Sequence, residues 1–344
     1  MDAPTEPVHV LLSAKVTAAQ IERMHNLHPR LVIDGEPGGY AIVDPRELDF
    51  RGLDYPEERP DVDVESLLAR AEVLVATRIP GDLTLRAPNL RWIQVTSAGI
   101  DHLWQPCLDD SPIVVTSAKG IHAIPMSEFA LSCMLLFAKR VLTMVKQQSA
   151  HQWRPFEIQE LHGKTVLLIG TGEIGAAVGR VAKQMGMKVI GVRRHSDRAE
   201  LPGGIDEVTD YDRAESALQH ADYVVSSLPM TQRTTALIGE ETFRSMKQSA
   251  VFINVGRGQT VDEQALVRAL TEGWIAGAAL DTFHKEPLPI DSLLWDLPNV
   301  LISPHMGADT PHYMERMTDL LCDNLQRYAL GKPLRNVIDP IERY

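Results

Sequence analysis

Three polar side chains with the chemistry to hold an anion and to move a proton each follow a short apolar run of the sequence. They are Arg257, Glu286 and His305. If those runs are parallel strands, the three side chains meet at the carboxyl edge of one open sheet, where ligands bind. Together they would form an active site. Taken singly, Arg257 could form a surface ion pair, Glu286 could be a solvated loop acid, and His305 could be a turn histidine.

A glycine-rich turn provides the cofactor site that this chemistry requires. The apolar run 166–169 leads directly into a Gly-x-Gly-x-x-Gly motif, and a helix over 174–185 and a strand over 188–192 are expected to follow. Glycines in this motif allow a tight turn, a close approach to a pyrophosphate and close packing of the helix on the strand. Amides at the helix N-terminus then face the anion. This βαβ context predicts dinucleotide binding by Gly170, Thr171, Gly172, Glu173, Ile174 and Gly175.

The residues after the second strand indicate which dinucleotide is bound. A site for NAD usually places a carboxylate there for the ribose 2′-hydroxyl. This chain has Arg193, Arg194 and Ser196 instead, and Asp197 comes too late for the usual ribose contact. Guanidinium groups and a hydroxyl suit a 2′-phosphate, although the two arginines could also be a solvated surface pair, with one stacked on adenine. The sequence therefore predicts a preference for NADP(H), with NAD(H) as the other cofactor that the site could take.

Strand-like and helix-like segments alternate along the chain, which predicts an α/β fold of two Rossmann-like lobes with parallel sheets. Before the glycine-rich turn, strands are expected at 8–12, 31–33, 73–76, 90–95 and 113–115, with helices at 17–28, 64–71 and, as one long amphipathic segment, 122–148. After it, strands are expected at 223–226, 251–254, 276–280 and 300–302, with helices at 212–219, 240–245, 262–272 and 310–330. The final helix is expected to return to the first lobe.

Length and composition exclude several classes of protein. A chain of 344 residues and 38.2 kDa exceeds a single typical core, so two domains are expected. No apolar run is long enough to span a membrane, and the N-terminus lacks the pattern of a signal peptide. Three cysteines without metal-ligand spacing are typical of a reducing cytoplasm, and no metal site is expected. The formal net charge of −12 argues against a nucleic-acid partner.

Several motifs in a fixed order make the chain resemble the D-isomer-specific 2-hydroxyacid dehydrogenases over nearly its whole length. The matching blocks are 161–175, Leu228-Pro229, 246–258, 279–288 and 295–307. The resemblance implies a discontinuous substrate-binding domain, residues 1–119 and 309–344, and an inserted NAD(P)-binding domain, residues 120–308. It also places a helix and arm around 122–155 in a twofold interface, which implies a homodimer.

The resemblance gives each of the three polar residues a role in the reduction of a 2-oxo acid. Arg257 is the substrate arginine, whose charge holds the carboxylate and carbonyl oxygens and stabilises the developing alkoxide. His305, as imidazolium, donates a proton to the carbonyl oxygen while the nicotinamide delivers hydride to carbon. Glu286, hydrogen-bonded to His305, favours the charged imidazole. In the oxidation direction the neutral imidazole acts as the base.

Further residues are assigned to the two ligands by the same resemblance. Asp281 matches the residue that holds the nicotinamide carboxamide, and Ala98 and Gly99 match a loop whose amides bind the substrate carboxylate. Arg78 is not assigned by the resemblance: from its position after the apolar run 73–76 it could add a contact to that carboxylate, or it could be a surface cation or part of a hinge salt bridge. The remaining expected cofactor contacts lie in the matching blocks and are Leu228, Pro229 and Val255.

Departures within the family narrow the prediction. Relatives that oxidise formate carry an amide at the position of Glu286, so a formate dehydrogenase is disfavoured. Phosphite dehydrogenases carry a lysine at the position of Ala98, which weakens the prediction of that activity. The expected protein is an NADP(H)-preferring reductase of the glyoxylate/hydroxypyruvate branch that acts on a small 2-oxo or 2-hydroxy acid. Branched and aromatic 2-oxo acids stay open as substrates. A phosphite dehydrogenase-like oxidoreductase is the alternative enzyme, and a corepressor-like sensor of the dinucleotide is the alternative binding protein.

Overall fold

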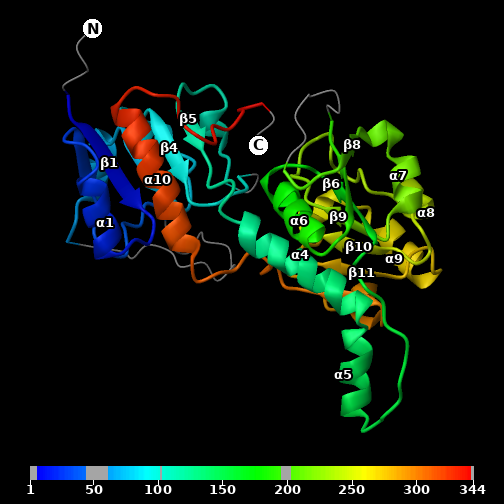
Figure 1. Ribbon diagram of the computed structural model, residues 1–344. Helices are drawn as coiled ribbons and strands as arrows, with labels where there is room; N and C mark the ends of the chain where they lie inside the picture. The colour runs from blue at the N-terminus through cyan, green and yellow to red at the C-terminus, as the bar shows by residue number, and fades with distance from the viewer. Residues whose placement is uncertain (1–5, 44–60, 101–102, 195–202, 342–344) are drawn as a thin grey trace. The chain divides into compact units, whose positions relative to one another are not determined.

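The chain folds into two compact units, seen in a computed structural model that describes residues 6–43, 61–100, 103–194 and 203–341 (Figure 1). One unit is made of Met1–Ile121 and Pro311–Tyr344, and the other of His122–Thr310. The first unit is therefore discontinuous, and the second is inserted into it. The boundaries expected at 119 and 308 fall slightly before the two points where the chain crosses between the units.

The first unit is built on a parallel sheet whose described strands are five, in the order β2-β1-β3-β4-β5. These strands are β1 (Val8–Ser13), β2 (Leu31–Asp34), β3 (Val73–Ala76), β4 (Trp92–Val95) and β5 (Val114–Thr116). Helical segments that accompany them are α1 (Ala18–His25), α2 (Val64–Arg70), α3 (Leu83–Arg86), the 3-10 turn Pro106–Leu108 and α10 (Tyr313–Ala329).

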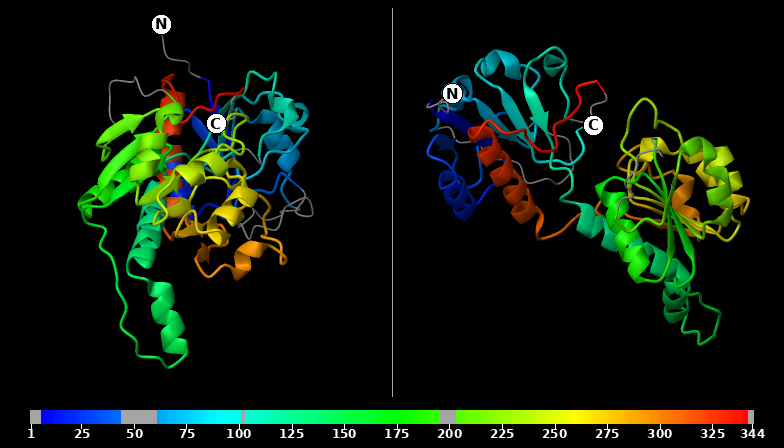
Figure 2. Two further views of the ribbon diagram at one scale, coloured as in Figure 1. Left: turned by 90° about the vertical axis from the view of Figure 1, so that its right-hand side faces the viewer. Right: turned by 45° about the horizontal axis from the view of Figure 1, so that its top comes forward.

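The last helix, α10, completes the first unit although it follows the second unit in the chain. Its Met317, Leu321 and Leu325 are buried in one core with Val10 of β1 and Trp92 of β4. Apolar side chains four residues apart lie on one face of a helix, and Figures 1 and 2 show this helix beside α1. Each such buried side chain contributes roughly 2 kcal/mol, so the first sheet depends on the C-terminal segment of the chain.

The second unit contains a parallel sheet whose described strands are seven, in the order β12-β11-β10-β9-β6-β7-β8. The strands are β6 (Thr165–Ile169), β7 (Lys188–Val192), β8 (Glu207–Thr209), β9 (Tyr223–Ser226), β10 (Val251–Asn254), β11 (Gly277–Leu280) and β12 (Val300–Ile302). The helices are α4 (Ala123–Ala138), α5 (Val141–Ser149), α6 (Glu173–Gln184), α7 (Glu215–His220), α8 (Glu240–Ser245) and α9 (Glu263–Thr271), with 3-10 turns at Tyr211–Arg213, Gly258–Thr260 and Leu293–Asp296.

Strand β6 shows how this sheet is buried on both faces. Val166 and Leu168 belong to a core shared with α4 and α6, whereas Leu167 and Ile169 belong to a core shared with α8 and α9. Successive side chains of a strand point to opposite faces. Because helices cover both faces, the strand is a continuous apolar run rather than an alternating one.

The expectation of one long helix over 122–148 is wrong, because the segment forms two helices that break at Lys139 and Arg140. Arg140 adopts a left-handed conformation, with a φ of 51°. The chain that returns after α5 holds this break from outside: the Arg140 guanidinium lies 5.1 Å from the centroid of the Phe156 ring. Lys139 Nζ also donates to the Gln159 carbonyl at 2.9 Å. These contacts are not local in sequence, and no glycine or proline marks the break.

Strand β8 is absent from the expected strands. It is a three-residue strand that pairs in parallel with Ile190, Gly191 and Val192 of β7. Its side chains are exposed or half-buried, so it lacks the apolar run by which the other strands are recognised. The strand matters for the site because it fixes the chain where β7 ends.

Candidate active site at the edge of the second sheet

The carboxyl edge of the seven-stranded sheet carries the expected catalytic and cofactor residues of the second unit that the structure describes. Loops follow six of its strands in spatial order β12, β11, β10, β9, β6 and β7. In that order the loops contribute His305, Asp281 with Glu286, Val255 with Arg257, Leu228 with Pro229, the turn Gly170–Gly175, and Arg193 with Arg194. An open parallel sheet binds its ligands at this edge.

His305 and Glu286 are hydrogen-bonded across two neighbouring loops. His305 Nδ1 lies 2.7 Å from Glu286 Oε2, and the other carboxylate oxygen accepts a hydrogen bond from the Phe283 amide at 3.0 Å. The carboxylate is thus fixed at both oxygens and holds the imidazole by Nδ1. The His305 side chain is 36% exposed, so its Nε2 is the nitrogen that can exchange a proton with a substrate.

Asp281 shapes the loop that carries His305. The buried Asp281 carboxylate accepts three hydrogen bonds at Oδ1, from Ser303 Oγ at 2.6 Å, the Met306 amide at 3.0 Å and the Gly307 amide at 2.9 Å. These bonds surround His305, whose backbone has a φ of 54°. This structural role was missed by sequence reasoning, although an acid directly after an apolar strand was a signal for it. The assignment of Asp281 to the nicotinamide carboxamide stays a prediction.

Arg257 lies on the loop between β10 and the 3-10 turn Gly258–Thr260. Its side chain is half-buried, and its backbone carbonyl accepts hydrogen bonds from Thr260 Oγ1 at 2.6 Å and Asn254 Nδ2 at 3.3 Å. Asn254 Nδ2 also donates to Thr282 Oγ1 at 3.3 Å. The loops after β10 and β11, which carry Arg257 and Glu286, are therefore tied together by one buried amide.

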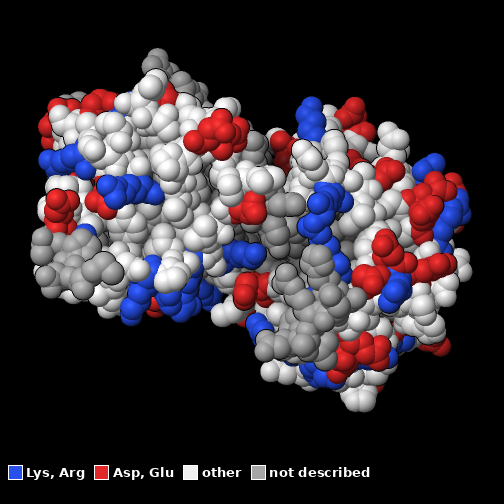
Figure 3. All heavy atoms as spheres, turned by 90° about the horizontal axis from the view of Figure 1, so that it is seen from above, with Lys and Arg blue, Asp and Glu red and all other residues white. Residues whose placement is uncertain are grey.

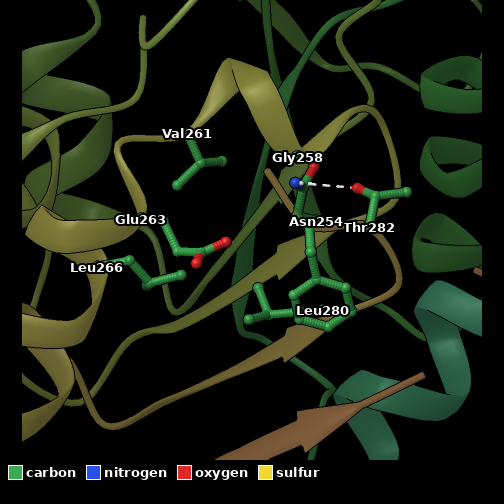
Figure 4. Close-up of a pocket in the computed structure, with 8 residues that line it drawn as sticks. Asn254, Gly258, Val261, Glu263, Leu266, Leu280 and Thr282 are labelled. Carbon is green, nitrogen blue, oxygen red and sulfur yellow. Dashed lines mark hydrogen bonds between the residues drawn. The ribbon is translucent and has the colours of Figure 1, made fainter. Parts of the chain in front are cut away.

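A small cavity lies between these two loops and α9 (Figure 4). Figure 4 shows the Asn254 amide and the Thr282 hydroxyl on one side of it and the Glu263 side chain on another. Glu263 Oε2 accepts a hydrogen bond from the His284 amide at 3.2 Å. The cavity belongs to the scaffold that supports the site, since neither Arg257 nor His305 lines it.

The glycine-rich turn has the form that a pyrophosphate requires. Gly170 has a φ of +100°, and a Cβ on Gly175 would lie 2.0 Å from the Gly170 carbonyl oxygen, so helix α6 packs directly on the turn. A Cβ on Gly172 would meet no described protein atom within 4 Å. Gly172 is the N-cap of α6 and no side chain caps the helix, which leaves its first amides directed at the open space. The turn therefore fits a dinucleotide.

The loop after β9 lies against this turn, and the loop after β10 lies against the loop after β9. Ser227 Oγ donates to the Gly170 carbonyl at 3.1 Å. A Cβ on Gly256 would lie 2.5 Å from the Leu228 carbonyl oxygen, so the two backbones are in contact. Leu228 and Pro229 thus follow a residue that is bonded to the turn, and Val255 follows the neighbouring strand β10. Their contact with a cofactor stays a prediction.

The two arginines after β7 differ in burial. Arg193 is half-buried and its amide donates to the Thr209 carbonyl of β8 at 3.0 Å, whereas Arg194 is exposed. Strand β8 thus fixes the backbone at Arg193. Ser196, the third expected phosphate ligand, lies outside the described residues.

The expected substrate-carboxylate residues belong to the first unit. Arg78 follows β3 and is half-buried, and Ala98 and Gly99 follow the neighbouring strand β4. Ser97 Oγ donates to the Gly99 carbonyl at 2.7 Å, which closes a tight turn in this loop. The candidate residues therefore form two groups, one on each unit.

Comparison with known proteins matches both units. Residues 131–307 match the family described as D-isomer specific 2-hydroxyacid dehydrogenase, NAD binding domain. The chain is 31% identical over 318 residues to a glyoxylate reductase of Korarchaeum cryptofilum, which covers 86% of this chain and 94% of the relative. A D-isomer specific 2-hydroxyacid dehydrogenase from Xanthobacter autotrophicus Py2, solved in complex with NADPH and MES, has a TM-score of 0.78 at 26% identity and covers 98% and 100% of the two chains.

A second solved structure bears on the cofactor. It is an NADPH-dependent glyoxylate/hydroxypyruvate reductase from Sinorhizobium meliloti in complex with NADP and sulfate. The TM-score is 0.76 at 25% identity, and the match covers 99% of this chain and 100% of that one. The likeness thus extends over the whole fold.

Proposed function

The chain belongs to the D-isomer-specific 2-hydroxyacid dehydrogenase family and is an NAD(P)-dependent oxidoreductase, and on that premise we propose that it is an NADP(H)-preferring reductase of small 2-oxo acids. The observation that carries the proposal is the 2.7 Å pair of His305 and Glu286 at the same sheet edge as the glycine-rich turn. A bound nicotinamide supplies the hydride. The protein supplies orientation, charge and the proton.

The proposed roles of the protein groups rest on their chemistry and on the family to which the chain belongs. Glu286, held by the Phe283 amide, stabilises the imidazolium form of His305, and His305 Nε2 gives its proton to the carbonyl oxygen of the substrate. Arg257 binds the substrate oxygens and stabilises the negative charge that develops on the carbonyl oxygen. In the reverse direction, neutral His305 takes the hydroxyl proton. Ala98, Gly99 and Arg78 are proposed to bind the substrate carboxylate.

Preference for NADP(H) is supported by the arginines after β7. No carboxylate stands there among the described residues, and Arg193 and Arg194 offer guanidinium groups to a 2′-phosphate. The Xanthobacter autotrophicus and Sinorhizobium meliloti relatives were solved with NADPH and NADP, and the second is a glyoxylate/hydroxypyruvate reductase. Glyoxylate and hydroxypyruvate are accordingly the proposed substrates.

The deciding experiment is the oxidation of NADPH and NADH, measured in parallel, with glyoxylate, hydroxypyruvate, pyruvate, phenylpyruvate and a branched 2-oxo acid. We expect clearly higher turnover with NADPH than with NADH. We also expect glyoxylate and hydroxypyruvate to be reduced faster than the other three acids. Higher turnover with NADH would still support a dehydrogenase and would contradict the preference for NADP(H). Nucleotide binding without turnover of any acid would favour the corepressor-like sensor, and oxidation of phosphite would favour the alternative enzyme.

A pair of variants tests the phosphate pocket separately. Arg193→Ala and Arg194→Ala are expected to lower kcat/KM with NADPH by about tenfold to a hundredfold each, because each removes a charge-assisted contact worth about 1.5–3 kcal/mol, and to leave kcat/KM with NADH within twofold. Arg180→Ala, which removes an exposed arginine of α6, is the matched control. Equal losses with both cofactors would contradict the pocket.

The remaining partners are proposed from the surface of the chain. Acidic and basic side chains are interspersed over the face in Figure 3, and the net charge is −12, which supports a small-molecule ligand over a nucleic acid. None of the described helices is both long and apolar enough to cross a membrane. All three cysteines are free thiols, which supports a cytoplasmic location. A homodimer through α5 and the chain that follows it is also proposed.

A further inference from the structure

Tyr313, the first residue of α10, is bonded to the loop that is expected to bind the substrate carboxylate. Its hydroxyl donates to the backbone carbonyl of Thr96, at the point where β4 ends and the loop Ser97–Gly99 begins. The two residues are 217 positions apart in the chain. The contact therefore exists only because α10 returns to the first unit.

The same point is held by a second side chain. Thr96 Oγ1 donates to Thr77 Oγ1 at 3.4 Å, and Thr77 immediately precedes Arg78. Ser97 is also fixed, since its carbonyl accepts from the Ala118 amide at 2.9 Å. Thr96 is thus the junction between the two neighbouring segments, after β3 and β4, that carry the expected carboxylate contacts.

The chemistry of Tyr313 suits a permanent anchor. Burial raises the pKa of its phenol to about 12, so the hydroxyl stays a donor throughout the pH range in which the enzyme works. A rigid aromatic side chain loses little conformational entropy when it makes one directed hydrogen bond. A loop whose amides bind an anion must present them at a fixed angle.

We propose that Tyr313 is a positioning residue for the substrate, which holds the loop Ser97–Gly99 in the geometry that binds the carboxylate of the 2-oxo acid. The proposal rests on the function proposed above. Because the carboxylate is bound equally in the ground state and in the transition state, loss of this anchor weakens substrate binding and leaves the chemical step intact.

The test compares two tyrosines of the same helix. Tyr313→Phe removes the anchor. Tyr328→Phe removes a comparable hydrogen bond, from its hydroxyl to Glu72 Oε1 at 2.6 Å. Glu72 directly precedes β3, so this bond lies at the amino edge of the sheet, away from the loop Ser97–Gly99. Both tyrosines are half-buried, and phenylalanine keeps the packing of each ring. We expect Tyr313→Phe to raise KM for glyoxylate by about threefold to tenfold, with kcat and KM for NADPH within twofold of the wild type.

Failure of the inference about Tyr313 can be distinguished from failure of the proposed function. Thermal melting is expected to show similar small losses of stability in both variants, while only Tyr313→Phe changes KM for the acid. If the wild type reduces 2-oxo acids and the two variants have the same KM, Tyr313 has a structural role alone and the inference is overturned. A fall in kcat with unchanged KM would also overturn it. If the wild type reduces no 2-oxo acid, the proposed function fails and the inference fails with it.

Discussion

At the scale of single residues, His305 and Glu286 act as one unit. The carboxylate is fixed by the Phe283 amide before it reaches the imidazole, so the pair is oriented without a substrate. Such preorganisation is what allows a proton donor to contribute to the rate at no cost of rearrangement. Both side chains stay partly accessible to solvent, with 36% of His305 and 20% of Glu286 exposed.

The pair can be tested by removing each member. We expect His305→Ala to lower kcat by about 10²–10⁴-fold, as for a lost general acid, with the Kd for NADPH within twofold. Glu286→Gln should lower kcat by a smaller factor, because an amide still orients the ring and does not stabilise its positive charge. Steady-state rates and nucleotide fluorescence titration measure the two quantities.

A control for this pair exists elsewhere in the chain. His312 Nδ1 lies 3.4 Å from Glu315 Oε2 in an exposed pair that the proposed mechanism does not use. His312→Ala should leave kcat unchanged. Near-normal turnover of His305→Ala would remove His305 from the mechanism.

At the scale of elements, two glycines of the glycine-rich turn differ in what surrounds them. Gly175 faces the Gly170 carbonyl, where no side chain fits, and Gly172 faces open space. Gly175 therefore allows α6 to pack on the turn, and a role of Gly172 in binding the cofactor stays a prediction. The Gly-x-Gly-x-x-Gly spacing already predicts these two roles, close packing of the helix at Gly175 and close approach of a pyrophosphate at Gly172.

Three alanine variants test this division. Gly175→Ala should lower the melting temperature, because overpacking of this kind costs about 1–3 kcal/mol. Gly172→Ala should leave the melting temperature unchanged and weaken NADPH binding by about tenfold, since its Cβ occupies the path of the pyrophosphate. Gly203→Ala, which also meets no atom within 4 Å and lies outside the turn, should change neither. Equal effects of Gly172→Ala and Gly203→Ala would contradict the assignment.

The elements also show what the sequence could and could not predict. The unit β6-α6-β7 was predictable, because its apolar strands and its glycine spacing are local signals. The break at Arg140 was not, since the contacts that hold it come from Phe156 and Gln159, which lie beyond α5. For the same reason, β8 is a strand only because β7 lies beside it. An acid directly after an apolar strand signalled a role for Asp281, but its bonding partners in the His305 loop could not be read from the sequence.

At the scale of the whole molecule, α5 is a helix that a single chain leaves uncovered. None of its side chains is buried, and Figure 2 shows it with the returning segment extending away from the sheet of the second unit. Val141, Met144 and Val145 are exposed at helical spacing, and Trp153 is 96% exposed. Apolar side chains gathered on such an arm favour an interface between two copies of the chain.

Sedimentation tests that interface. The wild type is expected to be a dimer at micromolar concentration, and Val145→Glu is expected to shift it towards monomer, because a charge would be buried against apolar surface. Lys146→Glu is the control: it changes the net charge by more than Val145→Glu does, but position 146 is exposed and lies outside the apolar set Val141, Met144 and Val145. This variant should leave the dimer intact. A wild-type monomer would contradict the proposed homodimer.

The double crossing of the chain between the units has a consequence for synthesis. On the ribosome, residues 122–310 emerge as one uninterrupted stretch and can fold as soon as they are complete, because domains generally fold as units in order of appearance. The first unit is begun before the second and completed after it, since its core includes α10, which follows the second unit in the chain. We therefore expect nascent chains to hold an open, apolar sheet face for most of their synthesis, and to need protection from aggregation at their N-terminal end.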